Sequence, residues 1–583
     1  MVFRLLGPPS NSTRWRRYGT AALAGLLLAM AYPKWNLSVL AWVAPAILLA
    51  TGMGRPGGKA FRCGYVGGFV FHLTGLYWLC KIPVPVAPIV GWVALSAYLA
   101  LYQGVWVWLS LRLYDRVFAP STSGTFWERF LSNRWPRQLG WYLTCAALWV
   151  AGEMVQARLF SGFPWNLLGV SQYSLVPLIQ ISSITGVYGI SFLVVWLSVA
   201  MLSAAAMVVM RPSRSRDWMI EIMPPLFAIA LVTAYGMRQV FYAPTEERAG
   251  LRATLIQPSV PQTVIWDADQ SEARFQDLLA LTRRALTNET DLLIWPEGAT
   301  PGLFRYETNI SSVILGLVRE YGVHLVFNSE DIRWDDPPTD GSDPTYRNFN
   351  ASFLLDPNGR LLSLYYKRKL VVFGEYVPLA RLLPFLRDFT SVHGDFSPGL
   401  KAADYYLPTY DMHATVLICF EDTFANLTRD TLRELSARDA GGRAPPGRKV
   451  DFLINLTNDG WFGDSAAQWQ HAANAVFRAV ENHIPMVRCA NNGLTCVVDE
   501  WGRMHHTYLP GTRDIYGTGF KNVIIPFRHG GPERTTFYQR WGDLFGWGCV
   551  AWGLLLGIWA VIGPRRRHGW PPTPNRWADA LGP

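Results

Sequence analysis

The chain carries two kinds of hydrophobic pattern. Over residues 1–243, and again near the C-terminus, apolar residues form long runs separated by short polar loops. Such runs are long enough to cross the ~30 Å hydrocarbon core of a bilayer as helices. Over residues 244–540 the apolar runs are short and rich in β-branched residues, which predicts strands. The pattern therefore predicts three parts. These are an N-terminal membrane domain, 1–243, a water-exposed domain, 244–540, and a C-terminal membrane helix with its tail, 541–583.

The long apolar runs predict about eight membrane-spanning helices. The first two are short and closely spaced, so they could instead form a re-entrant hairpin. The stretch 166–187 is only moderately apolar and contains glutamines and serines, which favours an interfacial or re-entrant segment. The predicted spans are residues 18–32, 36–53, 62–80, 88–111, 138–157, 188–210, 222–242 and 543–563.

Composition and charge support this interpretation and give it an orientation. Only 16% of the residues are charged, against about 25% in soluble proteins. The net charge of +10 does not indicate a nucleic-acid partner, because the basic residues cluster in alternate short loops. The positive-inside rule then places both termini in the cytoplasm and residues 244–540 on the other face, the periplasm in a bacterium. The first helix lacks a clear cleavage site, so we expect a retained anchor.

In the water-exposed part, predicted strands alternate with predicted helices, which indicates an α/β layered domain. A hairpin is expected at 356–359, and a surface loop at 440–448. The helices are expected at 270–287, 309–321, 422–437 and 466–482, and the strands at 253–257, 291–295, 323–327, 352–355, 414–418, 452–455 and 495–498.

Three apolar runs in this domain end on residues that could do chemistry together. Val416 to Ile418 ends on Cys419, and two further runs end on Glu297 and Lys367. Each residue also has an ordinary interpretation, since a cysteine on a strand is usually packed in a core. The seven cysteines have neither metal-type spacing nor a disulfide pattern, and Cys419 alone stands where an apolar run turns acidic.

A thiol becomes a nucleophile when a base removes its proton. No histidine follows a comparable strand, so Glu297 is the candidate base. Lys367 would supply positive charge for the oxyanion that forms when the thiolate attacks an acyl carbonyl, with the backbone N–H of Phe420 as a second donor. The product would be a thioester that a second nucleophile resolves, which is ping-pong acyl chemistry.

These residues resemble the signatures of the nitrilase superfamily. The chain is similar over nearly its full length to the membrane-bound branch, the apolipoprotein N-acyltransferases. The matching motifs are Trp295-Pro296-Glu297, Lys367 with Phe373-Gly374-Glu375-Tyr376-Val377-Pro378, Ile418-Cys419-Phe420-Glu421, Gln257 through Pro261-Gln262 to Trp266, Asn458-Asp459-Gly460-Trp461-Phe462-Gly463, Gln470-His471, Arg478-Ala479-Val480-Glu481, Arg488 through Asn491-Asn492-Gly493, Phe163-Pro164-Trp165 and Gly186-Val187-Tyr188-Gly189-Ile190.

The resemblance implies an αββα sandwich above an eight-helix membrane domain. It implies transfer of an acyl chain from a phospholipid, typically phosphatidylethanolamine, to Cys419 and then to the α-amine of a diacylglyceryl-cysteine on an apolipoprotein. It implies a monomer in the bacterial inner membrane, with no cofactor, no metal and no nucleic-acid partner. Glu297 would be the base, Lys367 the oxyanion stabiliser and Cys419 the nucleophile, with Glu375, Glu421, Phe420, Asn458, Trp266 and Trp461 in supporting or substrate-binding positions.

Three features depart from this picture or stand outside it. Phe420 occupies a position where the family often has tyrosine, so a hydroxyl beside the nucleophile is missing. Glu153 lies inside a predicted span, where a carboxylate is costly and therefore a candidate functional residue. The ordinary interpretation is a packing carboxylate paired with a polar neighbour such as Arg158. The loop 440–448 could be a lineage insertion without an assigned role.

Two other functions are compatible with the same motifs. A membrane-anchored amidase would use the same three residues with water as the acceptor, but it would not explain the extent of the membrane domain. A scaffold that has lost activity would keep the fold, yet it would not need Glu297, Lys367 and Cys419 together.

Overall fold

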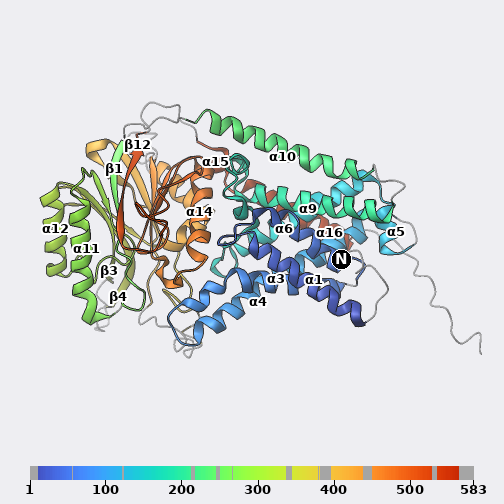
Figure 1. Cartoon of the computed structure of the whole chain (residues 1–583), viewed down its shortest axis with the longest axis horizontal. Coiled ribbons are helices and arrows are strands. Elements are labelled where there is room, and N and C mark those ends of the chain that lie inside the picture. Colours follow the sequence, from blue (N-terminus) through green and yellow to red (C-terminus); the bar gives the residue numbers. More distant parts are fainter. Residues whose placement is uncertain are drawn as a thin grey trace, which may run out of the picture.

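The molecule has a layered α/β half and a helical half, joined end to end in the computed structural model (Figure 1). The α/β half contains both sheets, and the N-terminal side of the chain lies at the far end of the helical half. The structure describes residues 11–55, 57–120, 124–211, 217–243, 250–265, 267–335, 345–378, 380, 382, 395–437, 450–527 and 535–562.

The first sheet has six strands in the order β12-β1-β2-β3-β4-β5. Its centre is parallel, because β1 pairs with β2 and β2 with β3 in the same direction, whereas the remaining pairs are antiparallel. The strands are β1 Gly250–Gln257, β2 Leu292–Ile294, β3 His324–Trp334, β4 Tyr346–Leu355, β5 Leu361–Tyr366 and β12 Gly519–Pro526.

The second sheet also has six strands, in the order β11-β10-β9-β8-β7-β6, with β7, β8 and β9 parallel. Alternate residues of β7, such as Val416 and Ile418, join the core between the two sheets, while Leu417 points into the core on the other face. The strands are β6 Tyr405–Leu407, β7 Met412–Ile418, β8 Phe452–Thr457, β9 Met486–Ala490, β10 Cys496–Val498 and β11 Met504–His505.

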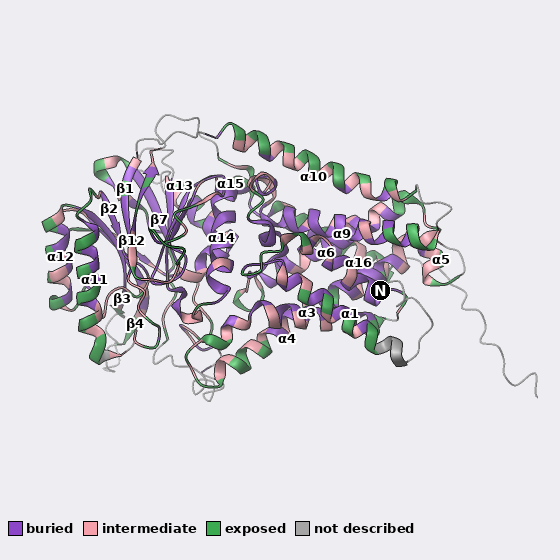
Figure 2. Ribbon diagram, in the orientation of Figure 1, coloured by how far each residue is buried: buried purple, intermediate pink, exposed green. Residues whose placement is uncertain are grey.

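Helices cover the outer faces of both sheets, which completes the αββα sandwich expected from the sequence. α11 Ser271–Ala285 and α12 Thr308–Tyr321 cover the first sheet. α13 Ala425–Ala437 and α14 Ala467–Asn482 belong to the second sheet. α14 lies between that sheet and the helical half, and it is buried along its whole length, as Figure 2 shows.

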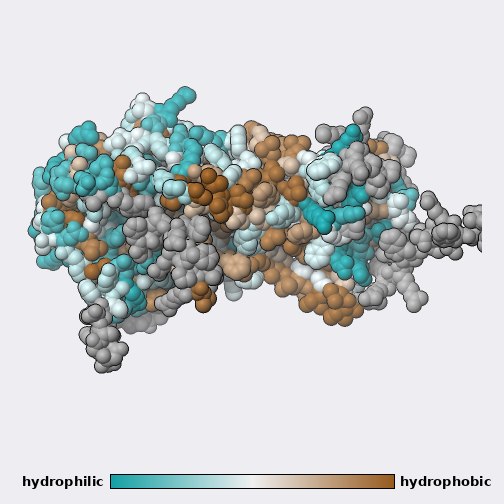
Figure 3. Space-filling view, turned by 90° about the horizontal axis from the view of Figure 1, so that it is seen from below, coloured by the Kyte–Doolittle hydropathy of each residue, from teal (hydrophilic) through white to brown (hydrophobic). Residues whose placement is uncertain are grey.

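In the helical half, four of the described helices are long and apolar enough to cross a membrane: α4 with its π-helical end (Ala87–Phe118), α9 Val187–Met210, α10 Trp218–Phe241 and α16 Leu544–Ile562. Figure 3 shows hydrophobic side chains gathered on this half and mostly hydrophilic ones on the sandwich. The other helices are α1 Asn11–Met30, α2 Ala44–Gly52, α3 Gly57–Gly75, α5 Phe126–Leu131, α6 Trp135–Gln156, α15 Phe537–Trp541 and the 3₁₀ turns η2 Ser38–Trp42 and η3 Tyr77–Lys81.

The second predicted span, 36–53, is not one long helix. It consists of the turn η2 and the nine-residue helix α2, which at about 1.5 Å per residue is much shorter than a bilayer core. The predicted interfacial stretch 166–187 likewise forms only short helical segments, η6 Leu168–Gln172, α7 Val176–Ile179 and α8 Ser182–Thr185. Its Gln180 donates to the carbonyl of Trp501 in the sandwich (2.8 Å), so this stretch joins the two halves.

Candidate active site

The three candidate residues lie at strand ends, as the sequence predicted. Cys419 directly follows β7 and begins the short 3₁₀ turn η11 Cys419–Thr423. Lys367 directly follows β5, and Glu297 lies in the turn after β2. Cys419 has a backbone φ of +53°, a left-handed conformation that residues other than glycine rarely adopt and that clusters at functional sites.

Glu297 and Lys367 meet directly, and a second carboxylate joins them. Lys367 Nζ lies 3.4 Å from Glu297 Oε1 and 2.9 Å from Glu375 Oε1. Asn350, on β4, donates from Nδ2 to the same two oxygens, at 3.0 Å and 2.8 Å. Both carboxylates are therefore fixed around one buried ammonium group, and Glu375 is further held by the backbone N–H of Val371 at 2.8 Å.

The charge state of this group follows from its surroundings. Burial lowers the pKa of Lys367, but Glu375, Glu297 and Cys419 outweigh burial and raise the pKa above its ordinary value. Burial and the neighbouring Glu297 raise the pKa of the Cys419 thiol, and Lys367 opposes them. The resting site thus holds an ammonium ion and a neutral thiol, so the thiol needs a base at the moment of reaction.

Glu421 ties two strand ends together beneath the nucleophile. Its carboxylate accepts from the backbone N–H of Ile418 (2.8 Å), at the end of β7. It also accepts from the N–H groups of Arg368 (2.7 Å) and Lys369 (2.9 Å), just after Lys367, and from the hydroxyl of Tyr365. Glu421 therefore fixes the position of Cys419 relative to Lys367, and its contacts are to the scaffold.

Aromatic side chains from both halves form a wall beside Cys419. The ring of Phe420 lies 5.9 Å from that of Phe163 and 6.1 Å from that of Trp165, both of which belong to the helical half. It also lies 5.1 Å from Phe424. The wall continues into Trp78, which contacts Trp165 and Phe462 at 5.0 Å and 4.4 Å between ring centroids. An apolar surface therefore leads from the helical half to the thiol.

Comparison with known proteins agrees with this arrangement. Residues 24–200 match the model of the apolipoprotein N-acyltransferase N-terminal domain, and residues 252–515 match that of carbon-nitrogen hydrolases. An apolipoprotein N-acyltransferase of Geobacter metallireducens is 35% identical over 570 residues, which cover 96% of this chain and 98% of the relative. Those of Rickettsia prowazekii and Bradyrhizobium diazoefficiens are 30% and 28% identical, over 76% and 93% of this chain and 80% and 95% of their own lengths.

The chain belongs to the apolipoprotein N-acyltransferase family. In this family member, Gln470 of α14 joins the site to the loops of the helical half. Its side-chain carbonyl accepts from three donors of that half, and its amide group donates to two backbone carbonyls there. The donors are Trp165 Nε1 (2.9 Å), Trp78 Nε1 (3.1 Å) and Asn166 Nδ2 (3.3 Å), and the acceptors are the carbonyls of Pro33 (2.8 Å) and Gly75 (3.3 Å).

The remaining sequence predictions for this N-acyltransferase have different outcomes. Asn458 caps the turn η13 Asp459–Phe462 and contacts Gln262 (2.7 Å), which makes it part of the scaffold near the site. Trp461 lies in that turn, half-buried beside the aromatic wall residue Phe462. Trp266 and the loop 440–448 lie outside the described residues.

Glu153 is held by hydrogen bonds within the helical half, but the prediction that Arg158 is its partner was wrong. One carboxylate oxygen of Glu153 accepts from Trp149 Nε1 (3.0 Å) and from the backbone N–H of Leu168 (2.7 Å). Arg158 instead forms an ion pair with Asp543, before α16. Glu153 therefore holds the stretch after α6 in place.

Sequence reasoning assigned no role to several residues that surround the nucleophile. Asn350, on β4, carries no signal of its own because it lies within a strand. His471 reaches the carbonyl of Cys419 from α14, at 3.3 Å, and it does not lie at the end of a predicted strand, where a histidine was expected. The motif Gln470-His471, which the family resemblance includes, was the available signal, and it lies on α14.

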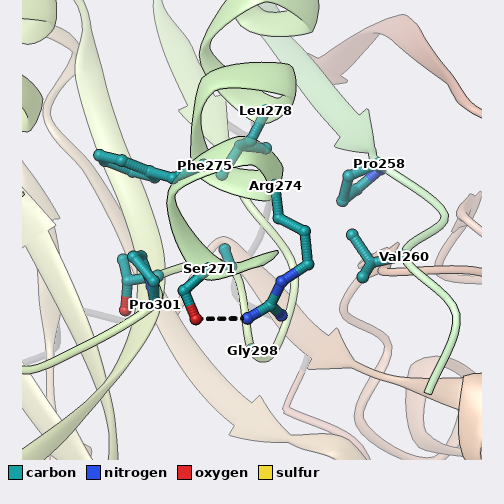
Figure 4. A pocket seen from close by; sticks show the side chains of 10 residues that line it. Pro258, Val260, Ser271, Arg274, Phe275, Leu278, Gly298 and Pro301 are labelled. Carbon is teal, nitrogen blue, oxygen red and sulfur yellow. Dashed lines mark hydrogen bonds between the residues drawn. The ribbon is translucent and has the colours of Figure 1, made fainter. Parts of the chain in front are cut away.

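A cavity beside the turn that carries Glu297 is too small to be the substrate site. It lies behind Gly298, between α11 and the segment that holds Pro258 and Val260, and Arg274 points across it to bond Ser271 Oγ at 2.9 Å (Figure 4). Its volume is about 20 Å³, which is roughly the space of one water molecule.

Proposed function

We propose that this protein transfers an acyl chain from a membrane phospholipid to the N-terminal amine of a diacylglyceryl-cysteine on an apolipoprotein. The transfer would pass through a thioester on Cys419. The relatives that support this proposal carry the name apolipoprotein N-acyltransferase, and one of them aligns with almost the whole chain. They favour an acyltransferase over the alternative of an amidase that uses water as the acceptor.

The observation that carries the proposal is the position of the thiol between two unlike surroundings. On one side stand the carboxylate of Glu297 and the ammonium group of Lys367. On the other side stands the wall of Phe420, Phe163 and Trp165, which the helical half helps to build. A small soluble amide would not need an apolar surface in order to bind. A lipid could place its acyl chain along that surface and its ester at the thiol.

In the first half-reaction Glu297 takes the proton of the Cys419 thiol as the sulfur attacks the ester carbonyl of the phospholipid. The oxyanion that develops is stabilised by Lys367, which Glu375 holds in place, and Asn350 in turn fixes the carboxylate of Glu375. When the carbon–oxygen bond breaks, Glu297 returns its proton to the leaving alkoxide, and a lysophospholipid departs. The acyl chain then remains on sulfur as a thioester.

In the second half-reaction the amine of the diacylglyceryl-cysteine attacks the thioester carbonyl. Glu297 accepts a proton from the amine, Lys367 again faces the oxyanion, and collapse forms an amide and releases the Cys419 thiolate. That thiolate recovers its proton from Glu297. The three groups thus return to their starting states without a cofactor or a metal ion.

We further propose how the protein lies in the membrane. The charge pattern of the loops places both termini in the cytoplasm and the sandwich, within residues 244–540, on the periplasmic face of a bacterial inner membrane. About eight spans and a monomeric enzyme complete the proposal. Both substrates are lipid-anchored, so a site directly above the bilayer lets each reach the thiol without leaving the membrane.

The test is mass spectrometry of the intact protein after incubation with phospholipid. We expect one acyl adduct on the peptide that contains Cys419, and its loss with formation of a triacylated product when a diacylated lipopeptide is added. The Cys419→Ser variant should carry no thioester and yield no product. Amide hydrolysis without triacylated product would favour the amidase, and unchanged activity of Cys419→Ser would overturn the mechanism.

A further inference from the structure

His471 lies in a set of partners that only a doubly protonated ring can satisfy. Its Nδ1 lies 2.8 Å from Asp459 Oδ1, and its Nε2 lies 2.8 Å from Asp422 Oδ1 and 3.3 Å from the carbonyl oxygen of Cys419. All three partners are acceptors. A neutral imidazole has one N–H and one bare nitrogen, so it would place a lone pair against a carboxylate. The geometry therefore requires N–H groups on both sides of the ring.

The charges around His471 balance only when the ring is cationic. Asp422, from η11, and Asp459, from η13, supply two negative charges. Arg488, from β9, forms ion pairs with both aspartates, and it supplies one positive charge. All four side chains are nearly inaccessible to solvent. With a protonated His471 the cluster is neutral, and with a neutral ring a net negative charge would remain buried beside the nucleophile.

The same ring helps to hold Cys419 in its unusual backbone conformation. A non-glycine residue at positive φ persists when its surroundings over-determine it. The carbonyl of Cys419 accepts from Asn455 Nδ2 at 3.0 Å as well as lying 3.3 Å from His471 Nε2. The ring of His471 also packs against Trp165 of the aromatic wall, at 5.4 Å between centroids. His471 thus contacts the nucleophile's backbone and the aromatic wall at the same time.

We propose that His471 is a positioning residue that is protonated at neutral pH, fixes the Cys419 backbone and neutralises the two buried aspartates. This inference rests on the proposed function, because it assumes that Cys419 must become anionic during turnover. His471 does not exchange protons with substrate and is not the base. Its positive charge offsets the two aspartates, so that the surroundings of the thiol do not oppose its ionisation.

A pH dependence follows from this arrangement. Burial lowers the pKa of His471, but Asp422 and Asp459 outweigh burial and the opposing Arg488 and raise the pKa to about 9. Because the folded-state pKa lies above the ordinary value, the contribution of the imidazolium is complete below about pH 6.5 and is lost as the pH rises through about 9. The rate of Cys419 acylation should therefore fall above about pH 9.

The experiment compares His471→Gln with His413→Gln in the full-length protein. His413, on β7, also bonds a carboxylate, Asp404 at 2.9 Å, but it lies near the opposite end of the strand. Two readouts are the rate of Cys419 alkylation by iodoacetamide, followed on its own peptide by mass spectrometry, and single-turnover acylation by phospholipid between pH 6 and 10.

At pH 7 we expect His471→Gln to slow alkylation at least about tenfold, because a net negative charge near the sulfur raises the thiol pKa by about one unit or more. The acylation rate should fall with little change in the KM for phospholipid, and the alkaline decline should disappear. His413→Gln should stay within about twofold of wild type. His471→Lys, which restores the charge, should recover part of the alkylation rate.

The proposal is overturned if wild-type acylation shows no decline above pH 9, a result that does not depend on whether a variant folds. Equal alkylation rates for wild type and His471→Gln would also overturn it. Either result leaves the acyl adduct on Cys419 intact, whereas failure of the proposed function would show as the absence of that adduct in wild type.

Discussion

The two helical layers of the sandwich have the same position relative to their sheets but different surroundings. α11 and α12 bury only the stripe that faces the first sheet, and their other faces are exposed. α14 is buried on every side, and it nonetheless carries Gln470, His471, Arg478 and Glu481. The outer layer, α11 and α12, thus only covers the core of the first sheet. The inner layer, represented by α14, is the interface between the second sheet and the helical half.

The polar residues of α14 are buried because each of them bonds a neighbouring segment. Gln470 holds loops of the helical half, and His471 holds the turn of the nucleophile. Arg478 bonds the carbonyl of Thr423 (3.1 Å) and pairs with Glu481 (2.8 Å), which accepts from the first backbone N–H of α9 (3.0 Å). One helix therefore connects the catalytic turn with the helical half, and a soluble enzyme of this fold would not need that connection.

The contrast between the two layers predicts the largest loss of stability for Arg478→Met. The matched control is Arg319→Met on α12. Arg319 bonds a backbone carbonyl at the surface, so its loss should cost at most about 0.5 kcal/mol. Removing Arg478 leaves Glu481 buried without its cation, which typically costs about 3–5 kcal/mol. Burial already raises the pKa of Glu481 to about 7 against the effect of Arg478, so protonation of Glu481 limits the loss to about 3 kcal/mol.

Thermal unfolding in detergent micelles measures this difference. At about 2–4 °C per kcal/mol for a domain of this size, Arg478→Met should lower the midpoint by about 6–12 °C and Arg319→Met by no more than about 2 °C. Similar midpoints for both variants would mean that the inner layer contributes no more than the outer one, and the contrast between the layers would fail.

A second effect, on the rate of acylation, is expected for Gln470→Ala against Gln276→Ala. Gln276 bonds Glu272 on the exposed face of α11. Loss of Gln470 leaves the indole N–H groups of Trp78 and Trp165 without their acceptor, at about 1–3 kcal/mol for each unsatisfied group. The wall should then shift relative to the thiol, so acylation by phospholipid should slow about tenfold while alkylation by iodoacetamide stays within about twofold.

The two rates separate a shifted wall from a damaged nucleophile. If alkylation slows as much as acylation in Gln470→Ala, the residue supports the catalytic turn itself and does not specifically place the wall. If neither rate changes, the contacts of Gln470 to the helical half have no functional consequence. Gln276→Ala should leave both rates unchanged.

The contrast between the layers also shows what the sequence could and could not predict. The apolar runs that end on Glu297, Lys367 and Cys419 are local signals, and the structure places all three at strand ends. The helix 466–482 was predicted almost to its observed bounds. Its burial on both sides was not, because the loops that cover it, around Trp78 and Trp165, lie more than 300 residues away in the chain.

Elements whose stability comes from such distant contacts were missed for the same reason. β9 was not predicted, because Arg488 interrupts its apolar run, and that arginine is stabilised by Asp422 and Asp459 from other segments. β12 was not predicted either, and its antiparallel partner β1 lies at the opposite end of the α/β domain in the sequence. The predicted second span, 36–53, is divided into the turn η2, of which only Ala41 is buried, and the buried helix α2. This division is compatible with the re-entrant hairpin that the sequence left as an alternative.

The smallest expected effect is that of Phe420→Tyr, which adds the hydroxyl that the family resemblance led us to expect beside the nucleophile. Phe420→Tyr keeps the ring between Phe163, Trp165 and Phe424 and adds only a hydroxyl, so acylation by phospholipid should change less than about threefold. Phe420→Ala removes the three ring contacts, each worth about 0.5–1.5 kcal/mol, and should slow acylation about tenfold or more. Single-turnover rates with one phospholipid decide between them. If Phe420→Tyr instead changes the rate more than tenfold, the hydroxyl positions the substrate, and the wall beside the thiol acts through polar contacts as well as through its apolar surface.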